Sequence, residues 1–233
     1  HKDTFPYPMK GKIIIICESW LEIDFKGCSP TATRPGGALL RAAGSLAAKG
    51  REVVFLSELG TDKVGAIIAD ALTADGVDIS KSDRHIAKTP VVLNIDGTSS
   101  RYGIQDDGEG FDITWPRVER EDIVVFGGYL AVDQRIRRQL WSFMTNVAER
   151  EATIVYVPDV ADDRIKRITK VMPYVYENLE IAGRVITLPS DLQALFSHND
   201  PERARRENFA YYVDDYSHLD DASLLADAID KTI

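Results

Sequence analysis

The sequence predicts an α/β protein whose doubly wound, mostly parallel sheet is flanked by helices on both faces. Residues 12–17 form a β-branched stretch that is continuously apolar from Ile13 to Cys17, which is typical of a strand covered on both sides. Residues 38–49 then place alanine and leucine on one helical stripe that ends at Gly50, and a second short apolar strand follows at 53–56. Such a strand, helix, strand unit takes a right-handed crossover. We therefore expect the sheet to grow by successive βα units.

The same alternation continues along the chain and predicts each later element. Gly97 lies between two short strand-like runs and predicts a hairpin, whereas the proline- and glycine-rich residues 26–37 predict a connection made of turns. After Leu188 the pattern becomes helical, with helix starts near Asp191 and Asp200. In chain order, the other expected elements are a helix at 64–74, strands at 90–95, 101–104 and 123–126, a helix at 134–150, a strand at 153–157, a helix from about 162, a strand at 185–188 and a last helix at 222–231.

Length and composition predict a single domain over residues 9–233. With 233 residues, 44% of them hydrophobic, the chain can bury a sizeable core. We expect residues 1–8, which precede Met9, to be a remnant of expression or a disordered start. The longest apolar run is far below the roughly 20 residues that cross a bilayer, and Cys17 and Cys28 have no CxxC spacing. These features predict a reduced, cytoplasmic protein with no membrane partner.

Charge and histidine spacing argue against two further classes of function. The formal net charge is -9, from 37 acidic and 28 basic residues, and such a chain repels a nucleic-acid backbone. The local cluster of Arg203, Arg205 and Arg206 is interpreted as the solvated face of a helix. The histidines are scattered without the spacing of metal ligands. We expect neither a nucleic-acid partner nor a metal site built from histidine.

Candidate ligand-binding residues follow from the geometry of parallel sheets, in which ligands bind outside the carboxyl ends of the strands. Glu18, Glu22 and Asp24 come directly after the first strand. Carboxylates there can accept hydrogen bonds from a polyol, although solvated loop carboxylates are an equal alternative.

Two turns carry further candidates. Gly36 and Gly37 precede the helix at 38–49, and the start of that helix can face a polar or anionic ligand; the alternative is a tight entry to the helix and nothing more. Asp62, in a Gly-Thr-Asp turn, is expected to cap the helix at 64–74.

The order and spacing of these motifs resemble the PfkB family of carbohydrate kinases. IIIICESWLEID resembles the family's first strand and substrate-binding loop, and GGALLRAAGSLAAKG resembles its double-glycine motif and first helix. VVFLSELGTDKVGAIIADALTADGVDIS is similar to its strand, G-x-D-x-x-G turn and following helix. TPVVLNIDG with SRYG resembles the hairpin of the family's β-lid, and DIVVFGGYL resembles a strand that ends beside the substrate.

This resemblance implies a ribokinase-like fold with lid segments at about 23–35 and 89–105. It implies an ATP-dependent transfer of the γ-phosphoryl group to a hydroxyl of a sugar or nucleoside, with ATP and magnesium as cofactors of an active enzyme. Independently of the resemblance, the exposed lid hairpin over 90–104 could pair with a second copy of the chain, because edge strands invite pairing, and this predicts a possible homodimer. By the same likeness, the substrate-binding residues are Glu22, Asp24, Gly36, Gly37, Arg41 and Tyr102.

The chain departs from the family's pattern at the end that handles phosphate. Arg41 stands where the resemblance implies asparagine, and Pro189 and Leu192 stand where it implies an N-x-x-E stretch. The family's Gly-Ala-Gly-Asp loop has no counterpart, because no glycine follows Gly183, and the carboxylates around Asp215 are interpreted as a solvated turn. The catalytic residues are therefore unknown. Two hypotheses stay open: a carbohydrate kinase that is impaired or incomplete in this chain, and a noncatalytic sugar-binding or dimerising domain.

Overall fold

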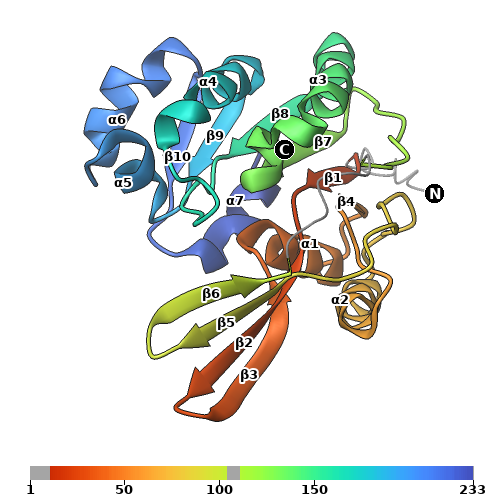
Figure 1. The fold of residues 1–233 in the computed structure, drawn as a ribbon. Helices are drawn as coiled ribbons and strands as arrows, with labels where there is room; N and C mark the ends of the chain where they lie inside the picture. The colour runs from red at the N-terminus through yellow and green to blue at the C-terminus, as the bar shows by residue number, and fades with distance from the viewer. Residues whose placement is uncertain (1–10, 104–110, 233) are drawn as a thin grey trace, which may run out of the picture.

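The computed structural model describes residues 11–103 and 111–232. Six parallel strands form the main sheet, in the order β10-β9-β8-β7-β1-β4 (Figure 1). The chain runs from β1 outward to β4 and then returns to the other side of β1 with β7, so the winding reverses between β1 and β7. The doubly wound sheet is confirmed, and its switch point lies at the carboxyl ends of these two strands. The strands are β1 (Ile13–Ile16), β4 (Val53–Leu56), β7 (Ile123–Gly127), β8 (Thr153–Val157), β9 (Arg184–Thr187) and β10 (Asp215–His218).

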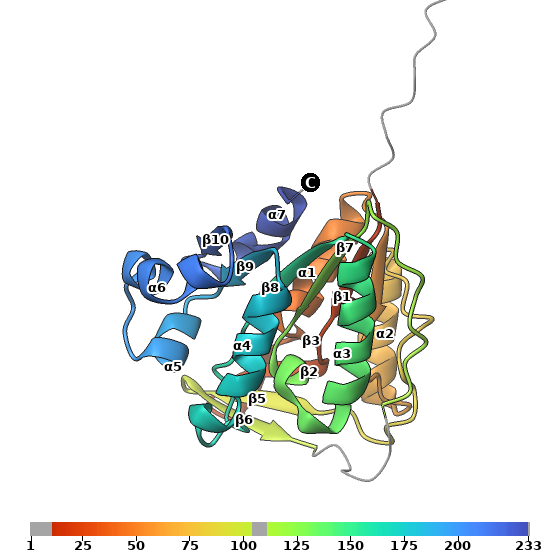
Figure 2. The same cartoon turned by 90° about the horizontal axis from the view of Figure 1, so that it is seen from above.

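Helices cover both faces of the main sheet (Figure 2). Alternate side chains of β1 point to opposite faces, so Ile13 and Ile15 pack against α1, α2 and α7, whereas Ile14 and Ile16 pack in the core with α3 and α4. Both faces of β1 are buried, and this explains why the strand is apolar at every position. The helices are α1 (Ala38–Ala48), α2 (Lys63–Ala74), α3 (Gln134–Glu149), α4 (Met172–Ile181), α5 (Asp191–Phe196), α6 (Pro201–Glu207) and α7 (Leu225–Asp230), with 3-10 turns η1 (Tyr129–Val132), η2 (Ile168–Lys170), η3 (Phe209–Tyr211) and η4 (Ala222–Leu224).

A second sheet of four strands, here the lid sheet, projects from the main sheet (Figure 1). Its strands are β2 (Trp20–Lys26), β3 (Ser29–Gly36), β5 (Val91–Ile95) and β6 (Thr98–Tyr102), in the order β3-β2-β5-β6. Two antiparallel hairpins, β2-β3 and β5-β6, join through a parallel pairing of β2 with β5. Because β2 directly follows β1, the lid sheet begins at the switch point of the main sheet.

The prediction of turns over residues 26–37 is wrong, because β3 occupies most of this stretch. Within residues 11–103 and 111–232, β3 pairs with β2 alone and forms an edge of the lid sheet. Pro30 and Pro35 are compatible with an edge strand, since an edge position can do without the proline N–H group. The second strand of the other hairpin also differs in its bounds: β6 is Thr98–Tyr102 rather than 101–104, and Ile104 lies outside the described residues.

The predicted helix from about residue 162 is also wrong. Asp162 accepts hydrogen bonds from the backbone N–H and the Nε of Arg164, and such a local turn competes with a helix. Helix α4 instead begins at Met172, with Pro173 in its first turn, where proline is favoured.

Nearer the C-terminus, the predicted helix at 222–231 divides into η4 and α7. Asp215, interpreted as part of a solvated turn, begins β10 and pairs with Arg184 of β9.

Capping by Asp62 is confirmed. Its Oδ1 accepts a hydrogen bond from the Gly65 N–H at 2.8 Å, and the same carboxylate accepts bonds from the backbone N–H and the Oγ1 of Thr89. Asp62 thus connects the start of α2 to the segment that leads into β5. Over residues 11–103 and 111–232, no helix combines the length and the apolar composition needed to cross a membrane.

Candidate functional site

A cavity of about 550 Å³ is lined by the lid sheet and by the carboxyl ends of the main strands. We call it the lid cavity. Its position outside the strand ends, next to the switch point, is where ligands of doubly wound sheets bind. The lining residues come from the segment after β1, from β2, β5, β6 and the start of α1, from the segments after β8 and β9, and from η4: Glu18, Trp20, Glu22, Gly37, Ala38, Arg41, Val92, Asn94, Ser99, Arg101, Asp159, Ala161, Asp162, Asp163, Leu188, Pro189, Ser190 and Ala222.

Strand β2 presents polar side chains at alternate positions, so Trp20, Glu22 and Asp24 share one face. Glu22 Oε1 accepts a hydrogen bond from Trp20 Nε1 at 3.2 Å, and its Oε2 lies 2.9 Å from Arg34 Nη2. Asp24 accepts bonds from Arg34 and from Asn94 Nδ2, which hold the pKa of this carboxyl below its ordinary value. Glu22 lines the lid cavity, whereas Asp24 is not among its lining residues.

The two glycines before α1 make room for an indole. A Cβ on Gly36 would lie 2.1 Å from Trp20 Nε1, and one on Gly37 would lie 3.2 Å from the far edge of the same ring. The guanidinium of Arg101 lies over the Trp20 ring at 4.7 Å from the centroid, in the geometry of a cation–π contact. Trp20 is therefore held between the glycine backbone and Arg101.

The remaining sequence-predicted residues divide into two groups. Arg41, on the first turn of α1, lines the lid cavity with its Nη1 3.7 Å from Glu22 Oε2. Gly37 also lines the lid cavity, and its positive φ of 101° is a backbone conformation that favours glycine. Tyr102 is 59% exposed on β6 and is not among the lining residues.

The segment after β8 adds a group of carboxylates to the cavity. Arg164 Nη2 donates to the buried Glu18 at 2.5 Å and also pairs with Asp162. Burial raises the pKa of Glu18 in spite of this pairing. Burial, together with the nearby Asp191, Glu18 and Asp162, raises the pKa of Asp159 to about 7. Asp159 also has a positive φ of 44, a sparsely populated conformation that recurs at functional sites.

The sequence reasoning missed four charged residues of the cavity as site members: Arg101, Asp159, Asp162 and Asp163. A signal for three of them was present, because they follow Val157 at the carboxyl end of a predicted strand, where ligands bind. Arg101 gives no such signal. It reaches the cavity only because β5 and β6 pair with β2 in the lid sheet.

The described residues on the η4 side of the cavity do not fit the phosphates of ATP. Asp221 caps its own turn by accepting a hydrogen bond from the Ser223 N–H at 2.9 Å, so a carboxylate occupies the position that a bound anion would need. Across residues 184–232 only Ser197 has a positive φ, whereas nests of inward N–H groups require such conformations. In the part of the chain that the structure describes, no group of three His, Cys, Asp or Glu side chains could hold a metal ion. The backbone of residues 184–232 therefore offers no nest of N–H groups to a phosphate.

Comparisons with solved structures show the same fold in sugar and nucleoside kinases. Aminoimidazole riboside kinase from Salmonella enterica, complexed with aminoimidazole riboside and an ATP analog, has a TM-score of 0.72 at 15% identity, covering 89% of this chain and 71% of that chain. Fructokinase from Vibrio cholerae O395 has a TM-score of 0.69 at 16% identity, covering 84% and 70%. A putative ribokinase II from E. coli, in complex with ATP and magnesium, has a TM-score of 0.66 at 18% identity, covering 89% and 72%.

The sequence itself identifies the family. A comparison with curated proteins finds no match. The family of pfkB carbohydrate kinases, however, matches residues 24–208, which include most of the lid sheet and four of the six main strands. The chain therefore belongs to the pfkB family of carbohydrate kinases.

Proposed function

We propose that the chain binds a neutral polyol, a sugar or a nucleoside, in the lid cavity, and that it does so without transferring phosphate. One observation carries this proposal: hydrogen-bonding groups from two sheets line a single cavity of about 550 Å³ at the switch point. Ligand cavities for small molecules are of this size. The similar structures from Salmonella enterica and Vibrio cholerae hold aminoimidazole riboside and fructose, which suggests the class of ligand.

The charges in the cavity favour a neutral ligand. An anion would meet an excess of carboxylates, whereas a hydroxyl group can donate to a carboxylate and accept from an arginine in the same site. The charged lining residues are Glu18, Glu22, Asp159, Asp162 and Asp163 against Arg41 and Arg101.

The residues around the η4 turn support the second part of the proposal, that the chain does not transfer phosphate. Phosphoryl transfer is catalysed by positive groups that are preorganised around the transferred phosphate. On this side the lid cavity is lined by Leu188, Pro189, Ser190 and Ala222, and the carboxylate of Asp221 takes the local N–H donor. Those residues offer no positive charge to a γ-phosphate.

Calorimetric titration with ribose, fructose and adenosine tests the binding half. We expect one of them to bind, and Glu22→Gln to weaken binding about tenfold or more, because a charge-assisted hydrogen bond is worth roughly 1.5–3 kcal/mol. Asp24→Asn is the matched control, since it neutralises a carboxylate on the same face of β2 that does not line the cavity. No heat from any polyol, or equal losses in the two variants, would contradict the assignment.

Phosphoryl transfer is the competing function, and one observation favours it. Asp159 has a pKa of about 7 and lines the lid cavity, so it could accept a proton from a substrate hydroxyl near neutral pH. We expect no ADP when ATP, magnesium and each polyol are mixed with the protein. ADP formed in step with a phosphorylated polyol, and lost in Asp159→Asn, would establish transfer instead.

A further inference from the structure

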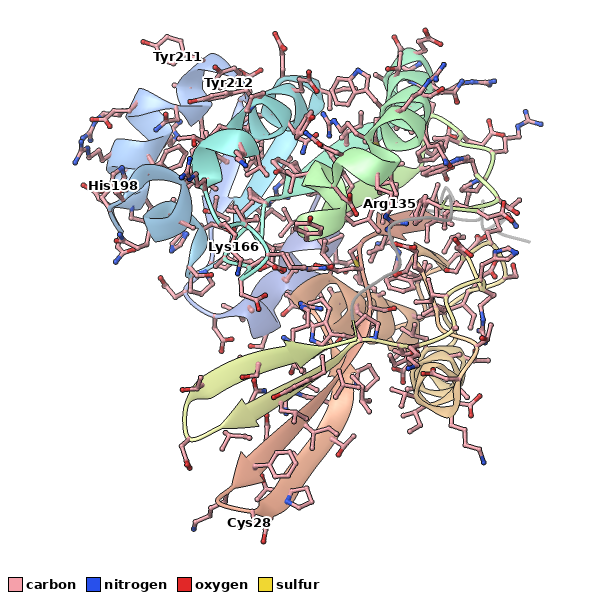
Figure 3. The ribbon with its side chains drawn as sticks, in the orientation of Figure 1. Cys28, Arg135, Lys166, His198, Tyr211 and Tyr212 are labelled. Carbon is pink, nitrogen blue, oxygen red and sulfur yellow. The ribbon has the colours of Figure 1, made fainter. Side chains whose placement is uncertain are left out.

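A second cavity, of about 490 Å³, lies on the other side of Arg164 from the lid cavity. We call it the basic cavity. It is formed by η1, the start of α3 and the loop between β8 and α4, and two tyrosines, Tyr129 and Tyr174, are part of its wall. Figure 3 marks Arg135 at the start of α3 and Lys166 on that loop. The cations that line it are Arg135, Arg164, Lys166, Arg167 and Lys170, against one carboxylate, Asp133.

Two of these five cations are neutralised by the fold. Arg135 Nη1 donates to Glu58 Oε2 at 3.0 Å, and Arg164 is held by Glu18 and by Asp162. Asp133 is also engaged, because it accepts a hydrogen bond from the Arg135 backbone N–H at 2.9 Å and caps α3. The carboxylates near the cavity are thus already satisfied by these two arginines.

The other three cations, Lys166, Arg167 and Lys170, form no ion pair with a carboxylate anywhere in residues 11–103 and 111–232. All three are exposed at the cavity mouth. The formal net charge of the chain is -9, yet this cavity carries three positive charges that no carboxylate of the described residues compensates. Like charges on the wall of one cavity repel one another, and a bound anion relieves that repulsion.

The two tyrosines of the basic cavity indicate which kind of anion fits it. The guanidinium of Arg164 lies 4.0 Å from the centroid of Tyr129, and that of Arg137 lies 5.2 Å from the centroid of Tyr174. Each ring thus already stacks on a cation, and Tyr174 Oη also accepts a bond from Gln134. These rings are poorly placed to stack on a nucleobase, so a compact anion fits better than a planar one.

We propose that the basic cavity binds the phosphate groups of a small phosphorylated ligand, with Lys166, Arg167 and Lys170 as the binding cations. Phosphate oxygens accept charge-assisted hydrogen bonds from lysine and arginine. The site is separate from the lid cavity, because none of these three cations lines that cavity.

Calorimetric titration with inorganic pyrophosphate at low ionic strength tests this site. We expect Lys166→Ala/Arg167→Ala to weaken pyrophosphate binding about tenfold or more, and binding to the wild-type chain to weaken as salt is added. Arg205→Ala/Arg206→Ala on α6 is the matched control, because it removes two adjacent exposed arginines elsewhere. Lys170→Ala alone, with its fold checked by circular dichroism, gives an independent variant.

Two further ligands identify the source of the phosphate groups. Free adenosine should not compete with pyrophosphate. If the phosphate tail of a nucleotide is the natural ligand, ATP should compete with pyrophosphate through that tail. If a free phosphate compound is the natural ligand, only pyrophosphate or phosphate should bind. No binding of pyrophosphate at low salt, or the same affinity in Lys166→Ala/Arg167→Ala as in wild type, would overturn the proposal. Glu22→Gln should leave pyrophosphate binding unchanged, so the two cavities are tested separately.

Discussion

Asp159 is a carboxyl whose proton the fold retains at a pH where an exposed aspartate is ionised. Its pKa rises from 3.8 to about 7, first because it is buried and then because Asp191, Glu18 and Asp162 are close. Between these two pKa values the folded chain holds a proton that the unfolded chain releases. Its contribution to the free energy of unfolding is therefore complete below about pH 4 and is lost as the pH rises to about 7.

Above about pH 7 the folded chain must hold the ionised Asp159 carboxylate in a buried position, which lowers the free energy of unfolding. Asp159→Asn removes that charge with little change in the shape of the side chain. We expect the variant to be more stable than wild type at pH 8, by about 1–2 kcal/mol since one pKa unit corresponds to about 1.4 kcal/mol and the side chain is only partly shielded from water. The difference should shrink as the pH falls below 6. Urea denaturation of both proteins between pH 5 and pH 8 measures it, and parallel pH profiles would count against a raised pKa at this residue.

At the same scale, the sequence predicted some members of the site and not their partners. Glu22 and Arg41 could be proposed from their positions after the first strand and in the double-glycine helix. That Gly36 contacts an indole rather than open space could not be predicted, because it depends on where the Trp20 side chain turns. The same limit applies to Arg101, whose contact with Trp20 joins residues 81 positions apart in the chain.

At the scale of whole elements, one buried side chain connects the segments that follow the carboxyl ends of β8 and β9. Asp191 accepts hydrogen bonds from the Leu188 N–H at 2.7 Å and from the Val160 N–H at 3.0 Å. Burial raises the pKa of Asp191 to about 6, although these two bonds favour its charged form. The loops that form one wall of the lid cavity are thus positioned by Asp191.

Asp191→Asn should destabilise the protein by about 1–3 kcal/mol, the cost of one buried N–H group without a partner. The carboxylate of Asp191 accepts one hydrogen bond with each of its two oxygens. An asparagine has a single oxygen and would turn its NH₂ group toward one of the two backbone N–H groups, so that buried N–H group loses its partner. Thermal unfolding at pH 7 measures the loss. Asp221→Asn on η4 is the control, because asparagine caps a helix nearly as well as aspartate. Equal melting temperatures for wild type and Asp191→Asn would contradict this role.

The elements themselves were predictable where they are buried. β1, β4 and β7 carry long apolar runs because both of their faces are covered, and the sequence pattern therefore identifies them. β3 has mostly exposed residues together with Pro30 and Pro35, so nothing in its local pattern distinguishes it from a turn. Its strand conformation is set by pairing with β2, which is a tertiary effect.

At the scale of the whole molecule, the lid sheet has two open edges, β3 and β6. β3 carries two prolines, whereas β6 has none and exposes Tyr102 at the end far from the hairpin turn. Open edges of this kind can pair with a second copy of the same strand. A homodimer through the lid sheet therefore remains a prediction, with β6 as the edge better suited to pairing.

Light scattering after size-exclusion chromatography tests this prediction over a range of protein concentrations. We expect a dimer that Tyr102→Lys dissociates, because a charge on an edge strand opposes pairing. Tyr211→Lys is the control, since Tyr211 is 82% exposed on η3, away from the lid sheet (Figure 3). A monomer at every concentration would exclude pairing through either edge.

Arg164 lines the basic cavity and is paired with Glu18 and Asp162, which line the lid cavity. Its guanidinium donates to Glu18 on the side of the lid cavity, and its flat face rests on Tyr129 on the side of the basic cavity. A phosphate that drew Arg164 toward itself would loosen Glu18, and a polyol that tightened Glu18 would hold Arg164 back. Thermodynamic linkage then requires each ligand to alter the dissociation constant of the other by the same factor.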